Sequence, residues 1–235
     1  ISISKRHYIG GAVNMDSKMI NIMIEALGQT IYMVFFSTLF ASVLGFILGI
    51  IVTVTAPKGL KPNAVIYKVL DLVINVLRSF PFIILIVFII PLTRAIVGTP
   101  IGETAAIVPL TIAAAPFVAR IIESALKEVD SGVIEAAKSF GASNSQIIFK
   151  VMIKEAVPSI ISGLTLTIIN IIGYSAMAGS VGAGGLGKVA ISYGYQRYQT
   201  DVMIVTVIIL IIIVLYMLFV MMKANIKICF KFLLI

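Results

Sequence analysis

Residues 135–158 read EAAKSFGASNSQIIFKVMIKEAVP and form a polar stretch between two strongly apolar parts of the chain. Asp130 or Ser131, just before it, can cap the start of a short helix, and Gly141 can supply the left-handed residue that ends this helix. Small residues follow the first glutamate, so another protein can approach the helix closely. The stretch is therefore expected to lie outside the apolar part of the molecule.

A second short helix is predicted after the bend at the glycine. Ser143 and Gln146 have the spacing of a capping box, in which each side chain bonds the other residue's backbone N–H. Pro158 is expected to end this helix, because proline lacks the N–H that a helix interior needs. The polar stretch is thus predicted to be two short helices.

The composition indicates a membrane protein. Hydrophobic residues make up 60% of the 235 residues and charged residues 12%, against roughly 45–50% and about 25% in soluble domains. A chain this apolar cannot hide its surface in a globule of its own size, so lipid must surround much of it. The net charge of +8 is accounted for by anionic lipid headgroups, and no nucleic-acid partner is expected.

Stretches without charged residues locate the membrane spans. Three are longer than the roughly 20 residues that cross a hydrocarbon core, at residues 26–57, 156–187 and 202–222. Two shorter stretches, 80–92 (extended back through 72–77) and 104–119, are interpreted as spans broken or kinked by proline. The predicted fold is an all-α integral membrane protein with five transmembrane helices, centred near residues 42, 80, 112, 170 and 212, and with the polar stretch between spans three and four.

Lysine and arginine are distributed unevenly between the two sides of this arrangement. Twelve of the 18 follow the first, third and fifth spans, and six lie on the other side. The positive-inside rule then places the polar stretch and the C-terminus in the cytoplasm and the N-terminus outside. Residues 1–18 are expected to be a polar extension, with Met15 or Met19 as candidate first residues, 19–222 the transmembrane domain, and 223–235 a cytoplasmic tail.

A glycine-rich segment resembles a phosphate-binding loop only in part. Residues 182–188 read GAGGLGK, but the next residue, Val189, has no hydroxyl for Mg²⁺, and no strand precedes the segment. A glycine-rich re-entrant turn at the end of a span is favoured, and the chain is not expected to bind ATP. His7 and Cys229 are single residues of their kinds, so no metal site of His and Cys, disulfide or cofactor is expected within one chain.

The polar stretch resembles the EAA signature of importer permeases in the ABC transporter superfamily. In that family the segment is a coupling helix that docks on a cytoplasmic ATPase. The resemblance therefore assigns contact with the ATPase to Glu135, Ala136, Ala137 and Gly141. Two copies of such a permease pair with two ATPase subunits, and a lipid-anchored substrate-binding protein outside delivers the substrate.

Four further stretches are similar to the permeases of methionine importers, and with the EAA segment they cover roughly residues 20–220. They are NVLRSFPFIIL from Asn75, IPLTRAIVGT from Ile90, AAIVPLTIAAAPFVAR from Ala105 and GYSAMAGSVGAGGLG from Gly173. The resemblance implies a location in the bacterial plasma membrane and import of methionine, as the L and possibly the D form. The N-terminal extension and the last dozen residues carry no family motif.

Several residues have both a structural and a functional interpretation. Asp71 and Arg78 are seven residues apart, which puts them on one face of a helix, and a structural ion pair is favoured over contact with substrate. Pro81, Pro109 and Pro116 are expected to set kinks for packing. A role of these prolines as gating hinges stays open.

Tyr174 and Met177 are the candidates for lining a transport pathway. They are three residues apart in a span rich in glycine, serine and alanine, so small neighbours would let two copies pack closely while the larger side chains narrow the pore. Packing inside the bundle is the alternative role for both.

Three classes of function are compatible with a membrane protein of this kind. A stand-alone channel or secondary transporter would usually show internal repeats or several charges within the spans. A membrane enzyme would need a catalytic cluster, and the spans hold no histidine, cysteine or paired carboxylates. The translocation subunit of an ATP-driven importer, working by alternating access, is therefore favoured. Its substrate is expected to be methionine or, alternatively, another small amino acid or an osmoprotectant.

Overall fold

The computed structural model describes residues 17–233, except for the side chains at positions 224 and 227–233. The predicted N-terminal extension, which includes His7, lies outside these residues apart from its last two, and so does the side chain of the single cysteine. All regular elements within the described part of the chain are helices. The predicted all-α fold is confirmed.

Ten α-helices and two π-helical segments follow one another along the described chain. They are α1 (Ser17–Thr55), α2 (Ala64–Ser79), α3 (Phe82–Phe88), α4 (Ile90–Val97), α5 (Glu103–Lys127), α6 (Ser131–Ser139), α7 (Asn144–Gln146), η1 (Ile147–Met152), α8 (Ile153–Gly179), α9 (Gly185–Val189), η2 (Ala190–Tyr195) and α10 (Thr200–Leu233). Long apolar sequences take this form because a helix satisfies all of its backbone hydrogen bonds internally, which lipid requires.

Four of the helical stretches are long and apolar enough to cross a membrane, namely α1, α5, α10 and the continuous stretch from α7 through α8. The fifth predicted span, centred near residue 80, is a bent pair: α2 and α3 meet at an angle of 106°. Pro81 stands at the break, in an extended conformation before the first turn of α3. The sequence thus predicted the break, which is far sharper than a kink, and the bent pair is a fifth candidate span.

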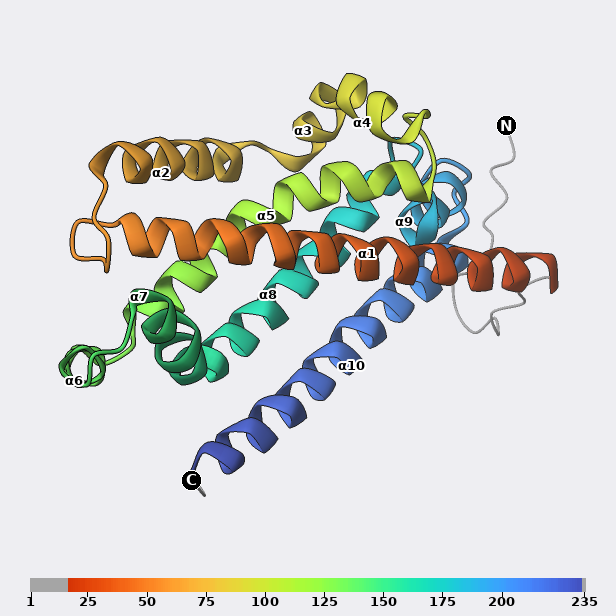
Figure 1. Ribbon diagram of the computed structural model, residues 1–235. Helices are drawn as coiled ribbons and strands as arrows, with labels where there is room; N and C mark the ends of the chain where they lie inside the picture. The colour runs from red at the N-terminus through yellow and green to blue at the C-terminus, as the bar shows by residue number, and fades with distance from the viewer. Residues whose placement is uncertain (1–16, 234–235) are drawn as a thin grey trace, which may run out of the picture.

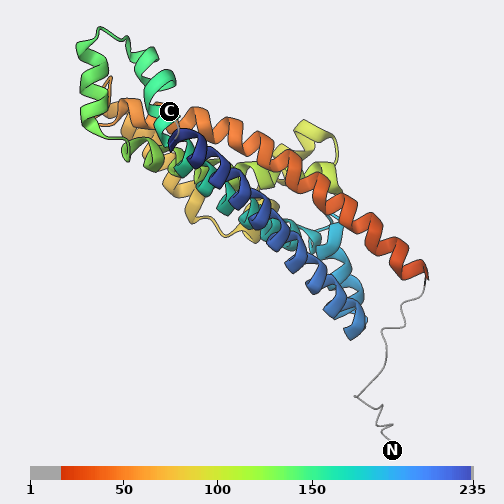
Figure 2. The same cartoon turned by 90° about the horizontal axis from the view of Figure 1, so that it is seen from below.

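The long helices pack around α5. Helix α1 lies beside α5 and runs in the same direction, α8 runs back along α5, and α10 packs against α8 (Figure 1). The turn after α1, helix α6 and the end of α10 lie together at one end of the molecule, called here the α6 end. The start of α1 and helix α9 lie at the other end, called the α9 end (Figures 1 and 2).

Two glycines let α1 and α5 approach each other closely. Gly45 and Gly49 are four residues apart in the sequence GFILG, a spacing common at helix–helix contacts in membranes. A Cβ atom on Gly45 would collide with the Cβ of Val118, and one on Gly49 would lie 2.6 Å from the Cβ of Ile122. The two helix backbones are therefore in direct contact.

The glycine-rich segment after α8 forms the predicted turn. Gly182, Gly184 and Gly185 all have positive φ angles, which return the chain against α8. The N–H of Gly185 donates to Gln29 Oε1 (2.7 Å) and the N–H of Leu186 to Thr30 Oγ1 (2.9 Å). Two of the backbone donors that a phosphate loop would present are thus already bonded to α1.

The prediction that Pro158 ends a helix is wrong. The chain is helical from Asn144 to Gly179 without a break, and Pro158 lies inside α8. Buried Ala156 and Ile160 on either side of the proline pack into the same core cluster, which holds the helix together across the missing hydrogen bond.

Pro109, Pro116 and the start of the expected C-terminal tail also lie within continuous helices. Helix α5 continues through both Pro109 and Pro116, which are buried within it. Helix α10 continues past the expected end of the last span as far as Leu233. The residues expected to form a separate tail therefore extend the same helix up to that point.

Candidate functional site

Helix α6 is short, and backbone groups at both of its ends form hydrogen bonds. At its start, Asp130 Oδ1 accepts a hydrogen bond from the N–H of Gly132 (2.6 Å), as predicted. At its end, the N–H of Ala142 donates to the carbonyl of Ala137 (3.1 Å) and the N–H of Gly141 to that of Lys138 (2.9 Å). This pair of bonds is a Schellman motif, which requires a left-handed residue.

Gly141 supplies that left-handed residue, with φ of +76°. Directly after it, Ser143 Oγ accepts from the N–H of Gln146, and Gln146 Oε1 accepts from the N–H of Ser143. The predicted turn and the predicted capping box are therefore both confirmed. Together they fix the direction of α6 relative to the helical stretch that becomes α8.

The side chains of this segment divide into a packed set and an exposed set. Ala137 is half-buried and packs with buried Ile147 against the core cluster that also holds Leu126. Glu135 and Ala136 are exposed. Three of the four predicted contact residues, Glu135, Ala136 and Gly141, thus face outward, and Ala137 attaches α6 to the bundle.

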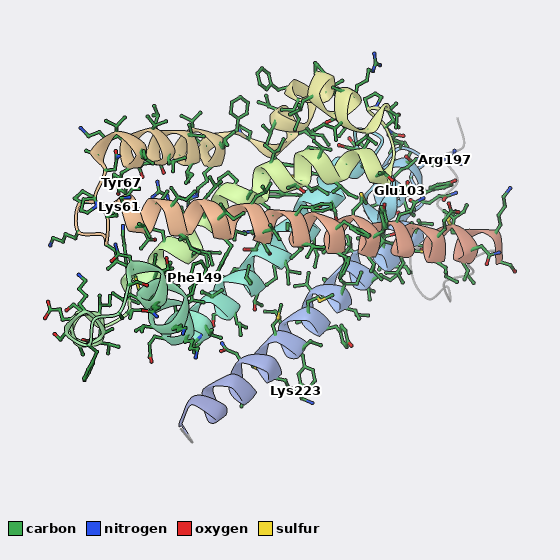
Figure 3. All side chains as sticks on the ribbon, viewed as in Figure 1. Lys61, Tyr67, Glu103, Phe149, Arg197 and Lys223 are labelled. Carbon is green, nitrogen blue, oxygen red and sulfur yellow. The ribbon has the colours of Figure 1, made fainter. Side chains whose placement is uncertain are left out.

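Phe140 is a candidate contact residue that the sequence interpretation did not single out. Its side chain is 91% exposed, and Phe149 from the following π-helical segment is 58% exposed at the same end of the molecule (Figure 3). Exposed large apolar residues beside a polar helix mark interaction sites. The sequence held no signal for it, because its exposure depends on how α6 sits on the core. We call Glu135, Ala136, Phe140 and Gly141 the α6 surface.

A cavity of about 430 Å³ adjoins α6 on the side of the turn that follows α1. Glu135 and Lys138 line it from α6, and Lys58 and Gly59 line it from the turn. The α6 surface therefore combines a concave, charged part with a protruding aromatic side chain. Such a surface suits docking of another protein and carries no arrangement for catalysis.

The predicted ion pair between Asp71 and Arg78 is wrong. Asp71 pairs with Arg120 of α5, which also hydrogen-bonds Asn75 Oδ1 (2.9 Å) and forms an ion pair with Glu123. Two side chains seven residues apart share a helix face but are separated by about 10 Å along the axis, whereas Arg120 reaches Asp71 from the side. The carboxylate therefore links α2 to α5.

Glu123 extends this network toward the α6 end. Its side chain is buried and also accepts a hydrogen bond from Lys127 Nζ (2.7 Å). Each charge in the network has an opposite charge beside it, which is what permits charges within apolar surroundings. Arg120 was missed because only tertiary structure brings α2 and α5 together.

The two candidate pathway residues occupy different surroundings. The ring of Tyr174 is half-buried and stacks on Phe82 of α3, with centroids 4.6 Å apart and an interplanar angle of 14°. Met177 is 50% exposed on the surface of α8. Tyr174 thus packs within the chain, and Met177 is free to line a surface.

The small residues around them mostly serve packing inside the chain. A Cβ on Gly179 would collide with the backbone of Lys188, and one on Gly187 with the backbone of Ala176. Gly173 differs, because a Cβ there would meet nothing. Small residues of α8 therefore let α9 pack closely against it. The surface at Gly173 and Met177 remains open to a further partner.

The chain resembles known proteins over most of its length. The family model described as "Binding-protein-dependent transport system inner membrane component" matches residues 41–226. A "Probable D-methionine transport system permease protein MetI" of Vibrio cholerae is 52% identical over 195 residues, which cover 83% of this chain and 84% of that protein. The "Methionine import system permease protein MetP" of Bacillus subtilis is 50% identical over 151 residues, which cover 64% and 68%.

Solved structures show the same fold. A chain from the inward-facing MetNI methionine ABC transporter matches with a TM-score of 0.89 and 42% identity, covering 91% of this chain and 99% of that one. A chain from an amino acid ABC transporter crystallised with histidines matches with a TM-score of 0.74 and 22% identity, covering 89% and 95%. At that identity the second likeness concerns the fold alone.

Proposed function

The chain belongs to the binding-protein-dependent transport system inner membrane component family, and we propose that it is the permease that carries methionine into a bacterial cell. The observation that carries this proposal is the 52% identity, over most of both chains, to a relative described as a probable D-methionine permease. The relative described as a methionine import permease supports the same substrate without naming an enantiomer. We propose import of L-methionine and of D-methionine.

The proposed assembly contains two copies of this chain, two cytoplasmic ATPase subunits and an extracytoplasmic substrate-binding lipoprotein. The α6 surface, with exposed Glu135, Ala136 and Phe140, is where the ATPase docks. The chain's own glycine-rich turn supports a separate ATPase, because two of its N–H groups, those of Gly185 and Leu186, are bonded to α1. The open surface at Gly173 and Met177 is where the second copy and the pathway meet.

The mechanism that we propose is alternating access. ATP binding closes the ATPase pair and draws the two docked α6 helices together, and the bundles rotate so that the pathway opens outward. Hydrolysis and release reverse the movement. The rigid connection between α6 and the bundle, through the Schellman motif at Gly141 and the packing of Ala137, supports transmission of such a movement.

The proposed orientation places the α6 end in the cytoplasm and the α9 end outside. Lys61 and Phe149 lie at the α6 end, whereas Glu103 and Arg197 lie at the α9 end (Figure 3). The turn that follows α1 lies at the same end of the molecule as α6. This supports the assignment of lysine and arginine to two sides, in which the segments after the first and third spans lie on the same side. The excess of lysine and arginine then favours the α6 end as cytoplasmic.

Single cysteines test this orientation in a Cys229→Ser background. Ser143→Cys, beside α6, should react with a membrane-impermeant maleimide only when the cytoplasmic face is open to the reagent. Gln196→Cys, at the α9 end, should react in intact cells or spheroplasts. Both positions are exposed, so burial would not explain a failure to react. Labelling from the opposite sides would overturn the orientation.

Competition for uptake tests the substrate. The complex of this chain, its ATPase and its binding protein is reconstituted in vesicles and supplied with labelled L-methionine. Excess unlabelled L-methionine and D-methionine should each reduce the uptake of label, whereas another small amino acid or an osmoprotectant should not. Helix α8 carries no charged residue from Ala156 to Gly179, which suits a zwitterion with an apolar side chain better than an inorganic ion. Block by a rival substrate and not by methionine would leave the importer class and remove the methionine assignment.

A further inference from the structure

Arg78 lies deep along the bundle. Its guanidinium carbon is 6.0 Å from the ring centroid of Phe117, and the neighbouring Val118 meets Gly45 of α1. Gly45 is ten residues before the end of α1 at Thr55, or about 15 Å along the helix. Because a hydrocarbon core is about 30 Å thick, Arg78 stands near the middle of the membrane if α1 ends at its surface. Figure 1 shows α2 lying alongside the C-terminal part of α1.

Arg78 is on the side of α2 that faces protein. The residues of α2 that pack inward are Tyr67, Asp71 and Ile74, at the spacing of one helix face, and Arg78 continues that row. The opposite face is apolar and open to lipid, with Leu72 63% exposed. Arg78 itself is exposed and lies in the last turn of α2, and its guanidinium lies over the ring of Phe117 in α5.

Arg78 opens into a groove between α5 and α8. The groove has a volume of about 270 Å³ and is lined by one face of α5, by α8 and by Arg78, with Phe117, Arg120, Ile121, Ser124, Ala125, Glu128, Ser159 and Gly163 as the other lining residues. Pockets for drug-sized ligands have about 300–1,000 Å³, so this volume suits a single amino acid. At the α6 end of the groove, Ser159 Oγ donates to Glu128 Oε2 (2.8 Å).

The guanidinium of Arg78 has no anionic partner among the side chains that the structure describes. The three ion pairs there involve Arg120 and Lys127 with Asp71 and Glu123. Arg120 lines the same groove but is already bonded to two carboxylates. Arg78 is thus a free cation at membrane depth, exposed to a groove of suitable size. Charges of this kind mark substrate pathways in membrane proteins.

We propose that Arg78 binds the carboxylate of the transported amino acid in the groove between α5 and α8. This inference rests on the proposed function and names the site within the pathway. The planar guanidinium can hold a carboxylate through two hydrogen bonds, and the apolar face of Phe117 beside it can contact the substrate's side chain. Glu128 is eleven residues beyond Phe117, about 16 Å along α5, so it is too distant to share the same small molecule and lies on the way out toward the α6 end.

A cysteine reporter in the groove tests the proposal directly. In a Cys229→Ser background, Ser124→Cys in the assembled complex should react with a positively charged methanethiosulfonate reagent. Millimolar methionine should slow this reaction, and methioninol, which lacks the carboxylate, should not. Adding Arg78→Met should abolish the protection by methionine, and Arg78→Lys should retain part of it. The proposal would be overturned if the reporter cysteine does not react, or if added methionine protects it equally well in the Arg78→Met variant.

Uptake by the reconstituted complex supplies the second measurement. Arg78→Met should lower methionine uptake about 10- to 100-fold, the value of a charged hydrogen-bond pair. Arg94→Met is the matched control, because it removes the same charge from exposed α4, outside the groove, and should change uptake less than about twofold. If the wild-type complex imports no methionine, the proposed function fails; if it does and Arg78→Met imports normally, only the role of Arg78 fails.

Discussion

Replacing Gly45 or Gly49 by leucine is expected to prevent assembly of a stable bundle. Each glycine touches α5 so closely that even a Cβ would collide with Val118 or Ile122, and the carbonyl of Ala115 is 2.7 Å from the Cβ position at Gly45. The obstacle includes backbone, so a side-chain rotation cannot relieve it. Overpacking costs about 1–3 kcal/mol where neighbours can adjust, and here we expect about 3 kcal/mol or more.

The measurement is the yield and melting temperature of detergent-solubilised protein after size-exclusion chromatography. Gly28→Leu is the matched control, because Gly28 lies in the same helix but a Cβ there would meet nothing within 4 Å. It should give protein with the wild-type profile. Wild-type yield and melting temperature for Gly45→Leu would contradict the close contact between α1 and α5.

The features that the sequence predicted correctly depend on local chemistry or on the membrane. Charge-free stretches are helical because lipid offers the backbone no other partner, and this located four long helices and the bent pair. Asp130, Gly141 and the capping box of Ser143 with Gln146 act within a few residues of themselves. Such features can be recognised without knowing what packs against them.

The features that were missed depend on contacts between helices. Pro158 has the local signature of a helix end, but packing of its neighbours in the core outweighs one lost hydrogen bond. Asp71 was paired with Arg78 because they share a helix, whereas the structure pairs it with Arg120, 49 residues away. The close approach at Gly45 could have been suspected from the spacing GFILG, but its partner helix could not.

The same distinction applies to the candidate site. The EAA resemblance located the α6 surface, and local capping rules gave its shape. The exposure of Phe140 and the burial of Ala137 could not be read from the sequence, because they depend on how α6 sits on the core. Tyr174 and Met177 likewise looked equivalent at a spacing of three residues, yet only Met177 is at the surface.

The combined change Glu135→Ala and Gly141→Leu is expected to uncouple ATP hydrolysis from uptake while the spans remain inserted. The first change removes an exposed carboxylate from the α6 surface. The second places a bulky side chain on that surface and forces a left-handed conformation on leucine, which costs about 1–2 kcal/mol. Loss of anchor residues from an interface weakens binding by about 2 kcal/mol or more, which is about thirtyfold in affinity. We therefore expect methionine uptake to fall about thirtyfold or more.

Three comparisons separate docking from folding. Ser145→Leu lies in the same segment, is exposed and has regular helical geometry, so it should leave uptake near wild type if bulk matters only on the α6 surface. Gly141→Ala keeps the backbone strain without the bulk, because a Cβ there meets nothing within 4 Å; its uptake shows how much of the loss is strain. The melting temperature of the double variant should stay within a few degrees of wild type, because α6 buries no residue of its own. Normal uptake by a well-expressed double variant would mean that the ATPase docks elsewhere, since no surface that transmits force could tolerate both changes.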